Sequence, residues 1–260
     1  MIDPVHSPRS GWRGWVGRPL WLEARVPIER RRLRRSRLWH GHELPDGRGR
    51  PVLIIPGFMS GPQSAAPLAH VLNTSGWRAQ IADIGRNAGP AYDSVDAAAR
   101  NLRVLADETS RPVAVVGHSR GGQFGRVLAY RHPELVHRVV AVTSPLRTKY
   151  PPFFLVKVPA ETLDRVWRAG VFGAVYPDRE QAVDDDRYRR LSDQIDLVSI
   201  YSRTDGILDW RYAFDQQARM VEIDATHLGV MQSIAGVQAI AAELDRPIAV
   251  EPLRSTQLGQ

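Results

Sequence analysis

The sequence predicts an α/β fold in which a doubly wound, mostly parallel β-sheet is flanked by helices. From Pro51 onward, short runs of aliphatic and β-branched residues alternate with amphipathic stretches, the pattern of buried parallel strands covered by helices on both faces. The chain has 260 residues, of which 43% are hydrophobic and 24% charged, as expected for one globular domain with a modest insertion. Arg, Asp or Pro interrupts the longest apolar runs, so none reaches the roughly 18 to 20 residues of a membrane-spanning helix.

Six apolar runs have the length of a strand. They lie at residues 52–55, 79–84, 113–116, 136–142, 197–201 and 220–223. Two further segments repeat apolar residues every three to four positions, which is helical spacing. The repeats are Val95, Ala98, Leu102 and Leu105, and then Val230, Ile234, Val237, Ala241 and Leu244. Both segments are expected to be helices packed on the sheet.

Residues 1–50 are a basic extension that precedes the main domain of residues 51–260. Six of its arginines crowd one short stretch: Arg30, Arg31, Arg32, Arg34, Arg35 and Arg37. The apolar residues at positions 28, 33 and 38 recur every five residues and drift around a helix, which favours a solvated helix that leads into the domain. The alternative is attraction to an anionic membrane surface or an acidic partner.

Composition narrows the classes of function. The formal net charge is +7 at pH 7, yet no helix-turn-helix, zinc-finger or RNA-binding motif accompanies it, so no nucleic-acid partner is expected. The absence of cysteine excludes disulfides, a thiolate nucleophile and cysteine-based metal sites. Because the first residues also lack the apolar region of a secretory signal, a cytoplasmic location is expected, with the membrane periphery as the alternative.

The stretch at about residues 145–193 breaks the alternation and is predicted to be a lid or cap insertion over the site. It contains Pro145, Pro151, Pro152, Pro159 and Pro177. Its acidic cluster at residues 184–186 lacks the alternating ligand spacing and the turn glycine of a calcium loop. A solvated acidic turn is therefore expected there, and no metal site is predicted.

A Gly-x-Ser-x-Gly motif marks the candidate nucleophile. Residues 117–121 read Gly-His-Ser-Arg-Gly and stand directly after the strand at 113–116 and before a helical pattern. A serine on a sharp strand-to-helix turn has a strained backbone, and the flanking glycines leave room for the neighbouring strand and helix. The hydroxyl of Ser119 would then project from the carboxyl edge of the sheet, close to the positive end of the helix.

Serine needs a base, and the base needs an acceptor that fixes its tautomer. Of the eight histidines, only His227 follows the last predicted strand, immediately before the C-terminal helix. Asp205 ends the preceding strand and is the preferred acid, while Asp209, one helical turn further on, is the alternative and is better suited to capping. The resulting chain order is Ser119, Asp205, His227.

Acyl chemistry also needs donors for a tetrahedral oxyanion. The first strand ends in Pro56-Gly57-Phe58, whose flexible turn can present a backbone N–H. The amides of Phe58 and Arg120 are therefore the expected donors. The side chains of these two residues are expected to shape the acyl pocket.

With these motifs, the chain resembles bacterial lipases and esterases of the α/β-hydrolase superfamily from Pro51 to about Leu244. The loops that carry the likeness read Tyr-Ser-Arg-Thr-Asp-Gly-Ile-Leu at residues 201–208 and Thr-His-Leu-Gly at 226–229. The resemblance implies a two-step acyl-enzyme mechanism without a cofactor. Many lipases carry His-Gly where this chain carries Pro56-Gly57, which makes ester hydrolysis a firmer expectation than triacylglycerol cleavage. The segment at residues 85–90 resembles a loop of other bacterial members and is expected to line the pocket or fix a loop.

The expected substrate is a small-molecule or lipid ester with an apolar acyl group of medium length. The candidates for contacting it are Met59, His118, Phe153, Phe154 and Trp167. The aromatic residues among them would equally serve to bury the insertion against the domain.

Two other functions stay open. An acyltransferase would use the same three residues with an alcohol in place of water, and a non-catalytic protein of the membrane surface would keep the fold and use the arginine-rich stretch. The oligomeric state is left open by the sequence.

Overall fold

The computed structural model describes residues 20–149, 161–163, 165–167, 169 and 176–247. Within them, six strands form one sheet in the order β2-β1-β3-β4-β5-β6, and all neighbouring strands run parallel. The strands are β1 (Pro51–Ile55), β2 (Arg78–Ile81), β3 (Val113–His118), β4 (Val136–Val142), β5 (Asp196–Ser202) and β6 (Arg219–Ile223). The predicted doubly wound α/β fold is confirmed.

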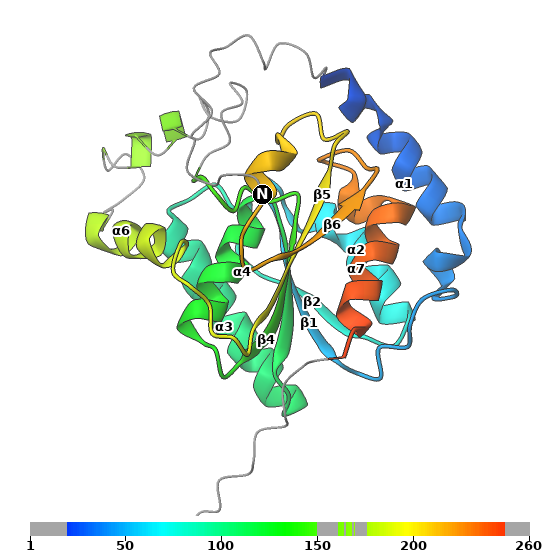
Figure 1. The fold of residues 1–260 in the computed structure, drawn as a ribbon, viewed down its shortest axis with the longest axis horizontal. Helices are drawn as coiled ribbons and strands as arrows, with labels where there is room; N and C mark the ends of the chain where they lie inside the picture. The colour runs from blue at the N-terminus through cyan, green and yellow to red at the C-terminus, as the bar shows by residue number, and fades with distance from the viewer. Residues whose placement is uncertain (1–19, 150–160, 164, 168, 170–175, 248–260) are drawn as a thin grey trace, which may run out of the picture.

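Helices cover both faces of the sheet (Figure 1). One face carries α1 (Val26–Arg35), α2 (Pro62–Thr74) and α7 (Ile234–Asp245), and the other carries α3 (Ala91–Thr109), α4 (Arg120–Arg131) and α6 (Pro177–Asp186). Short 3-10 helices lie at η2 (Leu20–Arg25), η3 (Arg37–His40), η4 (Trp210–Ala213) and η5 (Val230–Gln232). An apolar core fills the space between the sheet and the helices on each face, so the central strands β1, β3, β4 and β5 are largely buried on both sides and their ends are left for function.

Two predicted elements have different limits in the structure. The strand expected at residues 79–84 ends at Ile81, because the backbone turns there: the Ile84 amide donates to the Ala82 carbonyl at 3.0 Å. The helix expected from Val230 begins instead at Ile234, since the Ser233 hydroxyl accepts the Gly236 amide at 3.0 Å and caps a new helix.

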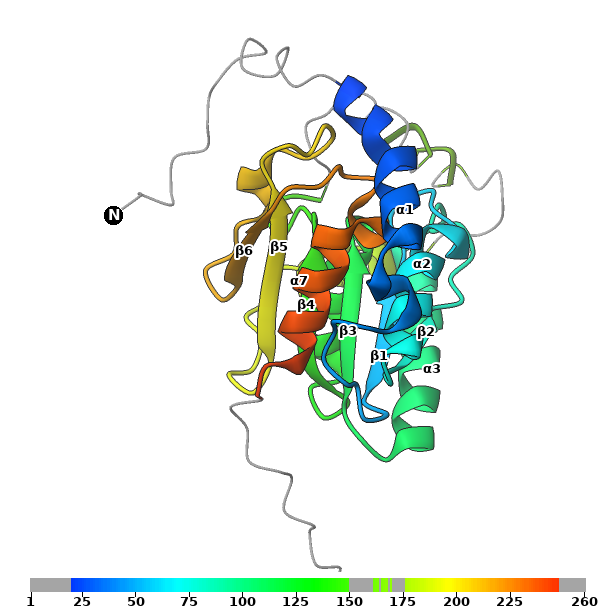
Figure 2. The same ribbon diagram turned by 90° about the vertical axis from the view of Figure 1, so that its right-hand side faces the viewer.

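The basic extension was predicted to form a solvated helix, and this prediction is wrong for one face of the helix. Helix α1 is present, but Leu33 and Leu38 are fully buried in the core beside α2 and α7, while Ile28 is 53% exposed. The five-residue spacing assumed one continuous helix. Helix α1 in fact ends at Arg35 with Ser36 as its C-cap, so Leu38 belongs to η3 and not to α1. Leu33, Leu38 and the partly buried Trp39 therefore pack on the same core as one face of the sheet, and α1 lies along that face (Figure 2).

The acidic cluster is not the solvated turn that was expected. Residues 184–186 form the last turn of α6. The Asp184 carboxylate lies 2.5 Å from the Lys149 ammonium and 3.0 Å from the Arg187 guanidinium, and Asp186 lies 2.7 Å from Arg131. The cluster thus ties α6 to α4 and to the chain after β4.

Among the residues that the structure describes, no helix is both long and apolar enough to cross a membrane. The same residues bring together no group of three or more His, Asp or Glu side chains that could hold a metal ion.

The packing of α1 gives a first prediction. Leu33→Ala should lower the free energy of unfolding by about 2 to 5 kcal/mol, because it leaves a cavity in the core. Ile28→Ala, on the exposed face of the same helix, should change it by less than about 0.5 kcal/mol. Chemical denaturation monitored by circular dichroism measures both, and equal effects would contradict the packing of this helix on the core.

Candidate active site

Ser119 occupies a strained turn between β3 and α4. Its backbone has φ 52° and ψ −119°, a region that is costly for a residue with a side chain and that concentrates at functional sites. Two glycines make the turn possible: a Cβ on Gly117 would overlap the Gly121 carbonyl oxygen, and a Cβ on Gly121 would overlap the Ile55 carbonyl oxygen. The structure thus has the tight strand-turn-helix geometry that the motif predicts, with Ser119 partly exposed.

Asp205 and His227 meet at the carboxyl ends of β5 and β6. The Asp205 Oδ2 atom lies 2.7 Å from His227 Nδ1, and both side chains are almost completely buried. The other Asp205 oxygen accepts the amides of Ile207 at 2.7 Å and Leu208 at 2.6 Å. The carboxylate is therefore satisfied on both sides, and it holds the imidazole in the tautomer that leaves Nε2 for chemistry.

The alternative acid, Asp209, has another task. Its carboxylate accepts the Arg211 amide at 3.0 Å as the N-cap of η4, and it pairs with the Arg211 guanidinium at 3.3 Å. This is the capping role expected of it, and Asp205 is the acid that the structure places against His227.

His118 links the nucleophile turn to the loop of the base. Its Nε2 lies 2.9 Å from the His227 carbonyl oxygen, and because a carbonyl only accepts, Nε2 carries the proton. The centroids of the His118 and His227 rings are 5.0 Å apart. Burial, reinforced by the charge of His227, lowers the pKa of His118 to about 3, so this ring stays neutral while it joins residues 118 and 227.

Among the described residues, no hydrogen bond joins Ser119 directly to His227. The connection between the two is the His118 bond, one residue before the serine. Hydrogen bonds of catalytic residues are often long or misaligned in structures without substrate and tighten only in the complex.

The loop at residues 85–90 fixes the neighbouring turn after β1. Asn87 is buried, has φ 49°, and donates its side-chain amide to the Pro56 carbonyl at 2.8 Å. Arg120 in turn donates to the Asn87 carbonyl at 3.1 Å and to the Gly89 carbonyl at 3.2 Å. These hydrogen bonds join residues 85–90 to Pro56 and Arg120, in line with the loop-fixing role expected of this segment.

The Arg120 side chain reaches the 85–90 loop. Its guanidinium binds carbonyl oxygens of that loop and lies 5.7 Å from the Phe58 ring, and its share in shaping an acyl pocket stays a prediction. Gly57 lies against the nucleophile turn, because a Cβ there would come within 2.8 Å of His118 Nδ1 and 3.3 Å of Ser119 Cβ. The turn of Phe58 and the turn of Ser119 are thus adjacent, as two backbone donors to one oxyanion would require; these amides remain predicted donors.

The remaining predicted contacts are scattered. Met59 is 54% exposed at φ 55°, and Trp167 lies beside Gly89, 3.9 Å from the position of a Cβ there. Phe153 and Phe154 lie outside the described residues. That these four residues and His118 contact a substrate stays a prediction.

Sequence reasoning missed Glu23, which joins the acid loop to the base loop. Its carboxylate accepts the amides of Gly206, His227 and Leu228, each at 2.9 Å. Glu29 does the same for the residue before the base, accepting the Thr226 amide at 3.1 Å and its hydroxyl at 2.6 Å. Residues 20–35, hereafter the N-terminal arm, thus hold both loops from outside.

One signal for these contacts exists in the sequence. Glu23 and Glu29 are the only acidic residues between positions 20 and 42, in a stretch that is otherwise rich in arginine. Two acidic residues in so basic a stretch indicate that they make specific contacts. The local sequence does not indicate which amides they bind.

The electrostatics of His227 follow from these neighbours. Burial alone lowers the pKa of His227, but the charge of Asp205, the hydrogen bond to it and the charge of Glu23 outweigh burial, so the pKa lies above its ordinary value. A raised pKa makes the imidazole a stronger base. It also means that, as the pH falls, the imidazole becomes protonated at a higher pH than an ordinary histidine does.

Comparisons with known proteins agree on the fold. The family model described as alpha/beta hydrolase fold matches residues 50–248. A search of curated proteins finds no matching sequence. Among solved structures, the Bacillus licheniformis lipase BlEst2 is 14% identical with a TM-score of 0.53, covering 78% of this chain and 94% of its own.

Two further solved structures are similar to the same extent. The monoacylglycerol lipase of Paleococcus ferrophilus is 20% identical with a TM-score of 0.51, covering 75% of this chain and 95% of its own. A structure of the metagenome-derived lipolytic enzymes LipS and LipT is 17% identical with a TM-score of 0.50, covering 72% and 89%. At these identities the likeness establishes the fold alone.

The role of Glu23 can be tested without a substrate. Glu23→Gln should lower the pKa of His227, because it removes a negative charge that favours the protonated imidazole. An NMR titration of the imidazole protons, assigned with His227→Gln, measures the shift. Glu108→Gln removes an exposed carboxylate paired with Arg78 and should leave the pKa of His227 unchanged. The same pKa of His227 in wild type and Glu23→Gln would contradict the electrostatic role of Glu23.

Proposed function

This chain belongs to the alpha/beta hydrolase fold family, and from that premise we propose that it is a serine carboxylic-ester hydrolase of the esterase and lipase type. The observation that carries the proposal is the buried 2.7 Å contact between Asp205 and His227, at the edge of the sheet where Ser119 stands on its strained turn. A fold alone does not prove activity, but a base held by a buried acid beside a strained serine is the arrangement that activates a weak nucleophile.

The proposed reaction has two steps. His227 accepts the proton of the Ser119 hydroxyl as the serine oxygen attacks the ester carbonyl, and the tetrahedral oxyanion is stabilised by the amides of Phe58 and Arg120. The protonated imidazole then donates that proton to the leaving alcohol, which leaves an acyl group on Ser119. In the second step a water molecule, deprotonated by His227, attacks the acyl carbonyl and releases the acid.

The surroundings support the assignment of each group. Asp205 remains ionised in this scheme and stabilises the imidazolium that forms during attack, and its two oxygens are already occupied by the ring and the 207–208 amides. No cofactor takes part in either step. Esters of apolar, medium-length acyl groups are the proposed substrates, with Met59 and Trp167 as wall residues at the mouth of the site.

Removal of the nucleophile gives the main test. Hydrolysis of p-nitrophenyl esters across acyl lengths should fall by about three orders of magnitude or more in Ser119→Ala, because the acyl-enzyme cannot form. Ser192→Ala changes an exposed serine and should keep the wild-type rate. A Ser119→Ala protein that is folded and hydrolyses at the wild-type rate would rule the mechanism out.

The choice of acid gives a second test. Asp205→Asn should lower kcat by about a factor of 10⁴, because the amide favours the wrong tautomer of the base. Asp209→Asn should lower kcat less than about threefold, since it alters only the cap of η4. The reverse ranking would assign the acid to Asp209.

A further inference from the structure

The outer face of the N-terminal arm carries an uncompensated positive charge. Arg30, Arg31, Arg32, Arg34 and Arg35 are all exposed, and among the described residues none of the five forms an ion pair. Some exposed arginines elsewhere on the surface, such as Arg78 and Arg179, do have acidic partners, Glu108 and Asp96. The charge of the arm is therefore available to an external partner.

The acidic residues of the arm do not neutralise these arginines. The carboxylates of Glu23 and Glu29 accept amides and a hydroxyl from the loops around His227. Within the described part of the chain, Arg25 is the one arginine that pairs with Glu29, at 3.8 Å. The two carboxylates therefore face the protein, and the five arginines face outward. No carboxylate of the arm cancels the positive potential of its outer face.

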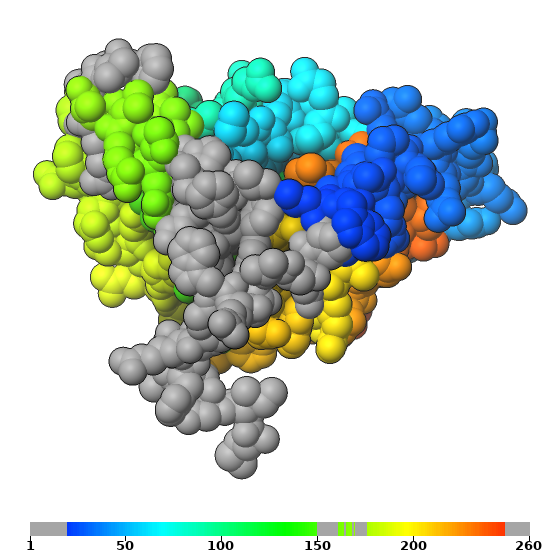
Figure 3. Space-filling view, turned by 90° about the horizontal axis from the view of Figure 1, so that it is seen from above, coloured from blue at the N-terminus to red at the C-terminus, as the bar shows by residue number. Residues whose placement is uncertain are grey.

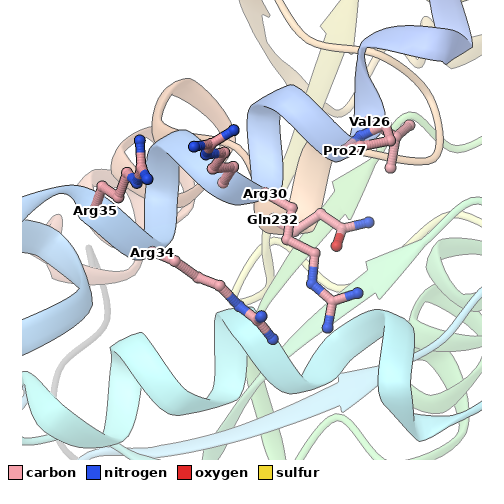
Figure 4. A pocket seen from close by; sticks show the side chains of 7 residues that line it. Val26, Pro27, Arg30, Arg34, Arg35 and Gln232 are labelled. Carbon is pink, nitrogen blue, oxygen red and sulfur yellow. The ribbon is translucent and has the colours of Figure 1, made fainter.

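The arginines also frame a groove. Four of them, Arg30, Arg31, Arg34 and Arg35, line a depression of about 580 Å³ with Val26, Pro27 and Gln232 (Figure 4). The Arg34 side chain extends from α1 toward α2 in this view. Guanidinium groups gathered in this way suit phosphate oxygens, which they bind through paired N–H donors.

Exposed apolar residues accompany the charge. Leu20 is 43% exposed, Trp21 is 70% exposed and Ile28 is 53% exposed, all on the same arm. A polyanion such as RNA is attracted by arginines and gains little from aliphatic side chains, whereas a bilayer interface binds both: its phosphates take the arginines, and its headgroup region accepts Trp, Leu and Ile. The combination of the two kinds of side chain favours a lipid surface.

The arm lies next to the candidate active site. Glu23 and Glu29 bind the loops that carry Asp205 and His227, and the arm lies beside these segments on one face of the molecule (Figure 3). A bilayer in contact with the outer face of the arm would therefore lie next to the candidate active site.

We propose that the outer face of the N-terminal arm docks on a membrane surface that contains anionic lipids. The arginines of the groove bind the headgroup phosphates, and Trp21 and Ile28 enter the interfacial region. This docking does not depend on the proposed hydrolysis, because it uses residues outside the candidate triad and its oxyanion donors.

The test is sedimentation of the full chain with vesicles. One set is phosphatidylcholine alone, and in the other about a third of the lipid is phosphatidylglycerol, which gives an anionic surface. The variant changes Arg30, Arg31, Arg34 and Arg35 together to Gln, which keeps helix propensity. The matched control changes Arg100, Arg103, Arg111 and Arg189 to Gln and so removes the same four charges from exposed positions elsewhere.

Each basic side chain at an anionic leaflet strengthens binding by about fivefold, so the arm variant, which loses four of them, should bind the anionic vesicles roughly 600-fold more weakly than wild type. The matched control should bind like wild type apart from a modest loss, and added salt should weaken binding of both. Trp21→Ser should also reduce binding, with the circular dichroism spectrum unchanged.

Four results would overturn the proposal: no binding to anionic vesicles, equal binding to both kinds of vesicle, equal losses in the arm variant and the matched control, or binding to single-stranded RNA in place of vesicles. Hydrolysis of a soluble p-nitrophenyl ester by the arm variant separates this proposal from the proposed function. That rate should stay at the wild-type level whether or not the protein binds lipid.

Discussion

The hydrogen bond between Asp205 and His227 is the contact on which the rest of the site depends. A carboxylate that is 2% exposed is tolerated only when both oxygens have partners, and here one oxygen takes the imidazole while the other takes two amides of its own loop. The ends of β5 and β6 therefore cannot be placed independently. Glu23 adds a second, partly buried bridge between the same two loops, and it does so from a part of the chain more than 180 residues away.

The serine side of the site has a separate set of constraints. The turn at residue 119 fits only because two glycines allow β1, β3 and α4 to approach closely. The Arg120 side chain then binds the 85–90 loop, whose Asn87 binds Pro56 at the end of β1. A chain of polar contacts thus runs from the nucleophile turn to the turn of the predicted oxyanion donor, and the His118 bond to the His227 carbonyl joins this side to the other. Preorganisation of this kind is what places fixed donors where charge develops in a reaction.

The sequence predicted those features that local patterns determine. Strand positions followed from buried aliphatic runs, and the turn at Ser119 followed from its glycines, because sheet burial and steric room are set within a few residues. The pairing of Asp205 with His227 could be anticipated because parallel strands deliver their following loops to one edge. The contacts of Glu23, Glu29 and Asn87 could not, since each joins segments distant in sequence and leaves no periodic pattern. The end of β2 and the break at Ser36 were missed for a similar reason: single backbone turns decide them.

We propose that folding activates Ser119 through His227. Covalent labelling with a fluorophosphonate, which reacts with activated serines, followed by mass spectrometry of the digested protein, measures this activation. We expect one added phosphonyl group, on the peptide that contains Ser119, and loss of that label in a folded His227→Ala variant. Absence of label from Ser119, or equal labelling in the variant without the imidazole, would contradict it.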